Sequence, residues 1–198
     1  MSKFLRSFLL LMGIFLLSCP PSLIAAEKSN TTFLQFHIQQ EISYFKGVWV
    51  SRPRDLDKKL LELINNNKIR SWDDYAYWLQ KNIKYRKDEL KDAWASPQVT
   101  LNLKQGDCED FTFLNIEVAK ILGYQPRFLA FVNHKKTHAV CVFKNQDHYV
   151  WFDNARLKKT KAASLSEFAS EVTKEYPYHY LLELDLKSHQ WKLLYTKS

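Results

Sequence analysis

The sequence contains little glycine and almost no cysteine, with four glycines and three cysteines among its 198 residues. It also lacks internal repeats and low-complexity tracts, which excludes repeat arrays and flexible linkers. By contrast, 46% of the residues are hydrophobic and 15% are aromatic, as in a folded globular protein. At this length we expect one domain with a sizeable core and not two ordinary domains.

The scarcity of cysteine leaves one disulfide to consider. Outside the leader described below, only Cys108 and Cys141 remain, and in an oxidising compartment they would form one structural bridge. Strand alternation over 138–143 opposes this, because it places His138 and Cys141 on different faces. If His138 faces Cys108, then Cys141 faces away. A disulfide and a catalytic thiol are competing interpretations, and we favour the thiol.

The chain is basic, with a formal charge of +8 and a pI of about 9.3. Its lysines and arginines are scattered, with small clusters at 58–59, 135–136 and 158–161. No basic stripe or nucleic-acid motif accompanies them, so we expect no nucleic-acid partner. Attraction to an anionic surface, such as a membrane or a wall polymer, stays open.

Residues 1–26 have the pattern of a secretory signal. Lys3 and Arg6 form a positive start, and Phe8–Leu17 is an apolar run too short to serve comfortably as a transmembrane helix. Small residues up to Ala26 offer a cleavage site. We therefore expect a periplasmic or otherwise exported protein.

A second reading of the leader changes the location but not the chemistry. Leu16–Cys19 resembles a bacterial lipoprotein signal, although Leu17 and Pro20 fit that pattern poorly. Processing there would anchor the chain to a membrane through a lipid on Cys19. Under either reading, 27–198 is expected to form a single domain.

Hydrophobic periodicity predicts helices first and then an antiparallel sheet with one inserted helix, which is an α+β fold. Residues 27–54 carry only a weak helical pattern. Helices are predicted from Asp55, after Ser71, over 97–103, behind Cys108 and after Ser164. Strands are predicted over 126–133, 137–144 and 148–153, with a closing hairpin over 178–186 and 190–195.

The segment Gly106–Phe111 opens the best-defined helix, which continues as an apolar run to Gly123. Asp107 is placed to cap the helix, and Asp110 is placed to return the bond in a capping box. Cys108 then lies in the first turn, at the positive end of the helix dipole, which lowers a thiol pKa. A cysteine nucleophile would be placed here.

His138 and Asp153 follow in the order of a thiol triad, on adjacent predicted strands. Thiol catalysis needs a thiolate, a base and a group that orients the base, and these residues can supply them in that order. The amide of Cys108 would be one oxyanion donor. Trp94 and Gln105 are candidates for a second donor, worth roughly 3–4 kcal/mol. Trp94 is equally well explained as a wall over the thiol or as ordinary packing.

Several short motifs resemble those of the bacterial transglutaminase-like cysteine proteinases, over about residues 70–157. The motifs are Trp94-Ala95-Ser96-Pro97, Gly106-Asp107-Cys108-Glu109-Asp110-Phe111, Leu122-Gly123-Tyr124, Thr137-His138-Ala139-Val140 and Phe152-Asp153-Asn154. The resemblance implies a papain-like fold with Cys108 as nucleophile, His138 as base and Asp153 as orienter. It also implies proteolysis in the periplasm. It says nothing of substrate choice, because 27–70 and the tail after 157 match no motif.

The acidic residues around Cys108 have two explanations. Asp107 and Glu109 would raise the thiol pKa if they faced it, so they either cap the helix and point away or hold a cation. The resemblance implies calcium for some family members. Calcium takes 6–8 oxygen ligands, of which this stretch supplies only a few. Thiol chemistry itself requires no cofactor.

These observations favour an exported cysteine peptidase that cleaves amide bonds of a protein substrate through a thioester on Cys108. Hydrolysis is favoured over crosslinking because the resemblance is to proteinases. A catalytically silent module that binds a peptide or an envelope polymer is the rival, and a cell-wall amidase is a further alternative. An intact set of Cys108, His138 and Asp153 argues against the silent module, since a binder has no need of all three.

Overall fold

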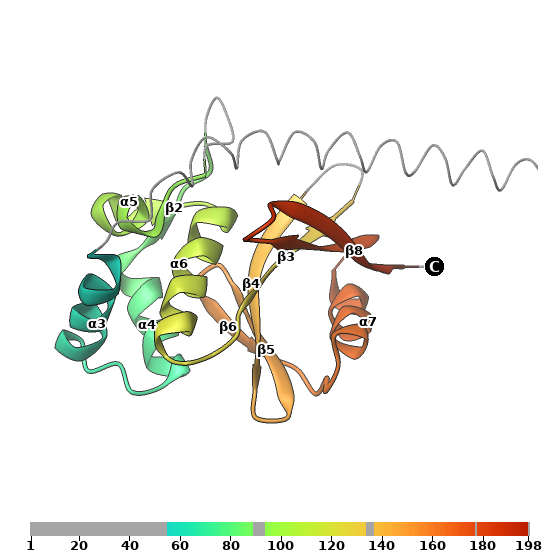
Figure 1. The fold of residues 1–198 in the computed structure, drawn as a ribbon, viewed down its shortest axis with the longest axis horizontal. Coiled ribbons are helices and arrows are strands. Elements are labelled where there is room, and N and C mark those ends of the chain that lie inside the picture. The colour runs from blue at the N-terminus through green and yellow to red at the C-terminus, as the bar shows by residue number, and fades with distance from the viewer. Residues whose placement is uncertain (1–54, 89–93, 134–136, 177, 198) are drawn as a thin grey trace, which may run out of the picture. The chain divides into compact units, whose positions relative to one another are not determined.

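A six-stranded antiparallel sheet forms the scaffold, with strand order β6-β5-β4-β3-β7-β8 (Figure 1). The computed structural model describes residues 55–88, 94–133, 137–176 and 178–197. The chain divides into two compact units, Met1–Glu41 and Ile42–Ser198, and every described residue belongs to the second. The strands are β3 (Arg127–Val132), β4 (Thr137–Asn145), β5 (His148–Asp153), β6 (Arg156–Lys159), β7 (Tyr180–Asp185) and β8 (Gln190–Thr196).

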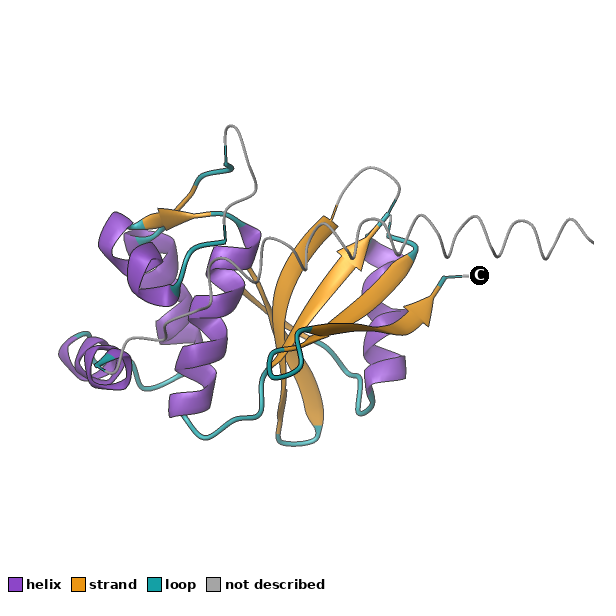
Figure 2. Cartoon of the chain, turned by 45° about the horizontal axis from the view of Figure 1, so that its top comes forward, coloured by secondary structure: helices purple, strands orange, loops and turns teal. Residues whose placement is uncertain are grey.

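Helices cover both faces of this sheet, with α6 on one face and α7 on the other (Figures 1 and 2). The helices are α3 (Leu56–Asn66), α4 (Trp72–Asn82), α5 (Pro97–Leu103), α6 (Cys108–Ile121) and α7 (Leu165–Glu175). A short parallel pair, β1 (Lys84–Tyr85) and β2 (Gln105–Gly106), leads directly into α6. The α+β prediction is therefore confirmed, with the cysteine-bearing helix packed on an antiparallel sheet.

Helix α6 lies at the centre of the larger hydrophobic cluster. Every residue from Glu109 to Ala119 is buried, because the sheet covers one side of the helix and α3, α4 and α5 pack around the others. The sheet contributes Ala139, Cys141 and Phe143 to this cluster. Apolar residues of α6 therefore lie on all sides of the helix and not on one stripe, as expected of a helix that is buried all round.

Helix α7 closes the opposite face of the sheet. Its residues Phe168, Ala169 and Val172 pack against Val140 and Val142 of β4. Ser164 caps the helix by accepting the N–H of Glu167 at 3.2 Å, as the sequence predicted. Alternate residues of one strand therefore serve two different cores.

Most predicted elements are confirmed to within one or two residues. The helix over 97–103 is present with those bounds, and the strand over 148–153 likewise. The sequence missed the short strands β1, β2 and β6. It also did not predict that β7 would lie beside β3, because that pairing joins segments separated by three strands and a helix.

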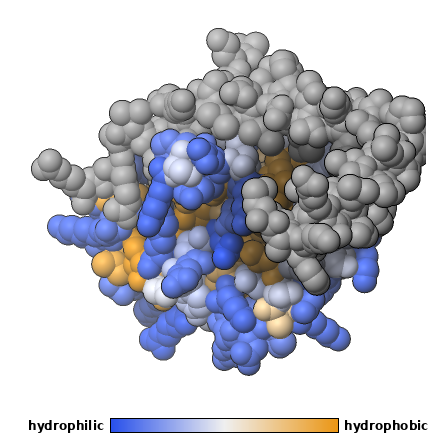
Figure 3. Space-filling view, turned by 45° about the vertical axis from the view of Figure 1, so that its right-hand side comes forward, coloured by the Kyte–Doolittle hydropathy of each residue, from blue (hydrophilic) through white to orange (hydrophobic). Residues whose placement is uncertain are grey.

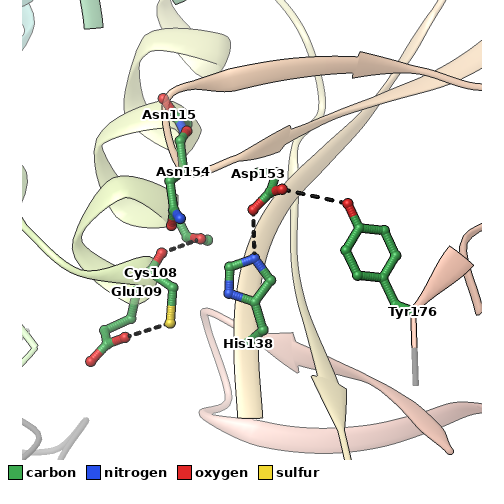
Figure 4. A network of polar contacts seen from close by, with 8 residues as sticks. Cys108, Glu109, Asn115, His138, Asp153, Asn154 and Tyr176 are labelled. Atoms are coloured by element: carbon green, nitrogen blue, oxygen red, sulfur yellow. Dashed lines mark hydrogen bonds and ion pairs between the residues drawn. The ribbon is translucent and has the colours of Figure 1, made fainter. Parts of the chain in front are cut away.

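The two cysteines are both free, so the disulfide interpretation is wrong for this structure. Strand alternation does place His138 and Cys141 of β4 on different faces of the sheet, but the expectation that Cys141 faces away from Cys108 was wrong. Cys141 packs in the cluster around α6, whereas His138 lies near the start of β4 with the parity of the opposite face. It nevertheless reaches the site, because Figure 4 shows it between Cys108 and Asp153.

The predicted leader, with its alternatives at Cys19 and Ala26, lies outside the described residues. Among the residues that the structure describes, no helix is long and apolar enough to cross a membrane. The described residues visible in Figure 3 are mostly hydrophilic, with smaller hydrophobic areas between the polar side chains.

The aromatic packing beneath α6 predicts a large loss of stability when Phe128 is truncated. Its ring is 1% exposed and lies 5.7 Å from Trp94 and 5.1 Å from Phe113. Phe128→Ala should lower the free energy of unfolding by about 3–5 kcal/mol, because it leaves a cavity. Leu193→Ala, at a position 49% exposed, should cost less than about 1 kcal/mol. Urea unfolding followed by circular dichroism measures both, and equal losses would contradict the packing described.

Candidate active site

The carboxylate of Asp110 holds the first turn of α6 and the loop before it in place. Asp107 and Asp110 form the predicted capping box, with the N–H of Asp107 donating to Asp110 Oδ2 at 3.3 Å. Asp110 Oδ1 also accepts the N–H of Ala95 at 2.6 Å, which ties the preceding loop to the helix. Gly106 is required here, because a Cβ atom would lie 2.6 Å from the Cβ of Asp110. Burial, opposed by these N–H bonds, raises the pKa of Asp110 to about 7.

The thiol of Cys108 hydrogen-bonds to a carboxylate in this structure. Its sulfur lies 3.1 Å from Oε2 of Glu109, and since a carboxylate only accepts, the thiol is the donor. Burial raises the pKa of Cys108 well above its usual value, and the charge of Glu109 raises it further. The N–H of Ala139 acts in the opposite direction. The helix dipole was expected to lower the pKa of the Cys108 thiol, but burial and the neighbouring Glu109 outweigh it.

His138 and Asp153 form a close pair. His138 Nε2 lies 2.9 Å from Asp153 Oδ1, and their side chains are 16% and 20% exposed. Because the carboxylate only accepts, Nε2 supplies the proton of this bond, and in the neutral imidazole Nδ1 then holds the lone pair. The hydrogen bond from His138 lowers the pKa of Asp153, so the carboxylate stays charged. Asp153 of β5 and His138 of β4 are diagonal neighbours. The register of the two strands places Val140 opposite Asp153, and His138 lies two residues before Val140.

Figure 4 shows the second ring nitrogen of His138 turned toward the sulfur of Cys108. In the described part of the chain, however, no hydrogen bond joins these two side chains. The structure thus brings the three predicted triad residues to one place, with His138 bonded to Asp153 and the thiol of Cys108 bonded to Glu109.

Three tyrosines that the sequence analysis did not single out lie around the site. The hydroxyl of Tyr176, at the end of α7, lies 3.5 Å from Asp153 Oδ2, which is a long contact (Figure 4). Tyr85 and Tyr178 lie close enough for the Cys108 charge to raise the pKa of each hydroxyl, after burial. None of these shows a motif, because each reaches the thiol region through the tertiary fold.

The two candidates for a second oxyanion donor lie in different environments. Trp94 is 3% exposed and packs in the core, 5.6 Å from Phe113 and stacked on Phe128. Gln105 is half-buried in β2, where it pairs with Lys84. The packing explains Trp94 without a catalytic role, and a second donor remains a prediction.

The candidate calcium ligands, Asp107 and Glu109, are each 4% exposed. Within residues 55–88, 94–133, 137–176 and 178–197, no group of three or more histidine, cysteine or acidic side chains is arranged to hold a metal ion. Two buried carboxylates have the oxygen chemistry that calcium prefers but cannot supply 6–8 ligands. These residues alone do not complete a calcium site.

The residues of this site lie within a segment of the chain that matches a known protein family. The sequence model of the Transglutaminase-like superfamily matches residues 58–159, which is just over half of the chain and includes all three triad positions. A search of the curated proteins finds no relative that matches the chain.

Two solved structures are similar to parts of the chain. One is a protein from Cytophaga hutchinsonii provisionally named a cysteine protease, with 20% identity and a TM-score of 0.43 over 52% of this chain. The chain covers only 41% of that protein. The other is Legionella pneumophila LapG, with 18% identity and a TM-score of 0.37, covering 59% of this chain and 75% of LapG. Both TM-scores are below 0.5 and both identities are at or below 20%, so the likeness is limited to parts of the chain.

The contact between Cys108 and Glu109 predicts that Glu109→Gln makes the thiol more acidic. Removing a like charge favours the thiolate, so the pH at which iodoacetamide labels Cys108 half-maximally should move downward. At neutral pH the labelling should accelerate several-fold, measured by mass spectrometry in buffer with a chelator. Glu117→Gln is the matched control, because Glu117 is a buried acid of the same helix paired with Lys120 at 2.7 Å. An unchanged labelling profile in Glu109→Gln would contradict the electrostatic account.

Proposed function

Because the chain belongs to the transglutaminase-like superfamily, we propose that it is a thiol hydrolase that cleaves amide bonds of a protein substrate. The observation that supports this most is the pair of His138 and Asp153, 2.9 Å apart, beside a thiol at a helix N-terminus. This is the arrangement that nucleophilic catalysis requires: a nucleophile, a base and a group that orients the base.

The reaction begins with a proton transfer. Sγ of Cys108 turns from Glu109 toward His138, and Nδ1 takes the thiol proton to give a thiolate and an imidazolium. Asp153 stabilises the imidazolium through Nε2–H. This ion pair offsets the burial and the acidic neighbour that oppose a free thiolate.

The thiolate then attacks the carbonyl carbon of the scissile amide. The backbone N–H of Cys108, at the start of α6, is placed to bind the oxyanion of the tetrahedral intermediate. The imidazolium donates its proton to the leaving amine as the C–N bond breaks and a thioester remains. His138 next removes a proton from water, which attacks the thioester, and the released Cys108 sulfur recovers its proton.

Three other functions share parts of this site. A silent binding module would need neither thiol reactivity nor His138. A crosslinking enzyme would resolve the thioester with an amine in place of water, and a cell-wall amidase would cut wall fragments and not proteins. Hydrolysis of a protein is favoured by the resemblance of the cysteine motif to proteinases.

We also propose that the protein is exported, either released after cleavage near Ala26 or anchored by a lipid at Cys19. The proposal rests on the leader pattern in the sequence alone. Mass spectrometry of the mature N-terminus distinguishes the two routes, since an acylated Cys19 would carry the mass of its lipid.

A thiol-reactive electrophile tests the proposed chemistry without knowledge of the substrate. Cys108 should be labelled much faster than Cys141, which is fully buried. His138→Ala should slow the labelling of Cys108 at least about tenfold at neutral pH, because the base is lost. The labelled sites are read by peptide mass spectrometry, and Cys141 serves as the internal control. If Cys108 reacts no faster than Cys141, or if His138→Ala changes nothing, the protein is a binding module.

We propose calcium as a structural ligand near Asp107 and Glu109, whose buried carboxylates would supply part of its shell of 6–8 oxygens while other oxygens complete it. When bound, it would neutralise charge beside the thiol. A chelator should then lower the melting temperature of the wild type and slow labelling of Cys108. Asp107→Asn should remove both responses, while Asp147→Asn, in the exposed β4–β5 turn, should keep them. If chelation leaves the melting temperature unchanged, calcium has no role in this fold.

A further inference from the structure

Two consecutive hydrogen bonds, through the buried side chains of Tyr75 and Asn115, connect α4, α6 and the turn that follows Asp153. The hydroxyl of Tyr75 lies 3.0 Å from Oδ1 of Asn115, and Nδ2 of Asn115 lies 3.0 Å from the backbone oxygen of Asn154. Tyr75 is fully buried and Asn115 is 1% exposed. Figure 4 shows Asn115 and Asn154 beside α6, next to the triad residues.

The direction of each hydrogen bond follows from chemistry. A backbone carbonyl can only accept, so the amide nitrogen of Asn115 donates to Asn154. The amide oxygen of Asn115 therefore accepts from the hydroxyl of Tyr75. Burial raises the pKa of Tyr75, which keeps that hydroxyl protonated as a donor. The amide of Asn115 is held on both sides in one orientation.

A polar pair inside an apolar helix interface calls for an explanation. Asn115 lies on α6 among Phe111, Leu114, Ile116 and Val118, all of which belong to the hydrophobic cluster. Buried amides cost free energy unless they are bonded, and an apolar pair of similar shape can be equally stable. The stability of the fold therefore does not require the polar pair of Tyr75 and Asn115. What an apolar pair could not supply is the hydrogen bond from Asn115 to the turn after Asp153.

That turn is held from a second helix as well. Gln80 of α4 donates its amide to the backbone oxygen of Ala155 at 3.2 Å. Two consecutive carbonyls of the turn thus accept side-chain amides from two different helices. Asn154 adopts a left-handed conformation with φ of 54°, so the chain reverses sharply between Asp153 and Arg156.

One face of α6 carries both the thiol and the contact with this turn. Cys108, Thr112 and Asn115 are separated by four and three residues, which places them on the same side of a helix. Thr112 donates its hydroxyl to the backbone oxygen of Cys108 at 2.7 Å, and Asn115 reaches Asn154. The helix that carries the nucleophile is thereby bonded directly to the residue that follows the acid.

We infer that Asn115, oriented by Tyr75, is a positioning residue that sets Asp153, and through it His138, against Cys108. The inference rests on the proposed function. Asn115 does not touch the reacting atoms. It fixes the distance between the nucleophile-bearing helix and the acid-bearing strand, and small displacements of this kind impair catalysis strongly.

A double variant separates positioning from stability. In Tyr75→Phe/Asn115→Leu both polar side chains become apolar together and only the Asn154 carbonyl loses a partner, so the urea midpoint should fall no further than in a variant that loses one such bond. Labelling of Cys108 by iodoacetamide at neutral pH should nevertheless fall about tenfold. The pH of half-maximal labelling should also move upward, because a displaced Asp153 supports the imidazolium less well. A wild-type rate and pH profile in the double variant would overturn the inference.

Two reference variants complete the test. Thr173→Val removes another buried bond to a backbone carbonyl, at 2.7 Å on the opposite face of the sheet, and should lower the urea midpoint with no change in labelling. Asp153→Asn should slow labelling as strongly as the double variant. If Asp153→Asn labels at the wild-type rate, the proposed triad itself fails. If it slows labelling but the double variant does not, only the inference about Asn115 fails.

Should the double variant fail to fold, Gln80→Ala tests the same inference at an exposed position. It removes the second bond to the turn and should slow labelling two- to threefold without unfolding the protein. Asn67→Ala, which removes an exposed amide bond to the Leu63 carbonyl at 2.8 Å, is its control. Equal labelling in Gln80→Ala and Asn67→Ala would overturn a positioning role for this turn.

Discussion

Helix α6 is enclosed by the sheet and by α3, α4 and α5 from Glu109 to Ala119, and the properties of the site depend on this burial. Burial is what allows a helix with few polar contacts to hold a fixed place against β4. It also removes water from a short segment that carries a thiol and three carboxylates. Charges placed there interact strongly with one another, since little solvent screens them. The same packing that orders the site therefore makes its ionisation difficult.

The electrostatics of the site are consequently a balance between opposing effects. Burial and the charge of Glu109 raise the pKa of the Cys108 thiol and favour its neutral form, whereas the N–H of Ala139 favours the thiolate. The hydrogen bond with His138 lowers the pKa of Asp153 and keeps it charged, and in the proposed reaction this charge would stabilise an imidazolium on His138. In the proposed mechanism, the thiol of Cys108 therefore stays protonated until its sulfur reaches the imidazole of His138. Reactivity then depends on geometry and not on an intrinsically acidic cysteine.

Local features of this chain could be predicted from sequence, and long-range ones could not. The capping box of Asp107 and Asp110 involves residues three apart, so its chemistry is visible in the sequence. The order of Cys108, His138 and Asp153 suggested a triad, but only strand twist and register decide that His138 approaches the thiol. The direction of Glu109 depends on which side of the helix start is buried, which no local pattern reveals. The tyrosines and Asn115 act through contacts between distant segments and carry no periodic signal.

The place of β7 in the sheet has a consequence for how the molecule is assembled. In chain order β7 follows β4, β5, β6 and α7, yet it pairs with β3. Until β7 has joined, β3 is an open edge whose Leu129 and Phe131 face a half-covered core, and such an edge readily pairs with other chains. The meander from β3 to β6 is thus an incomplete structure that association could capture. Pairings between segments this far apart in sequence generally form slowly, so the topology predicts that the unpaired β3 edge is exposed to association before β7 joins it.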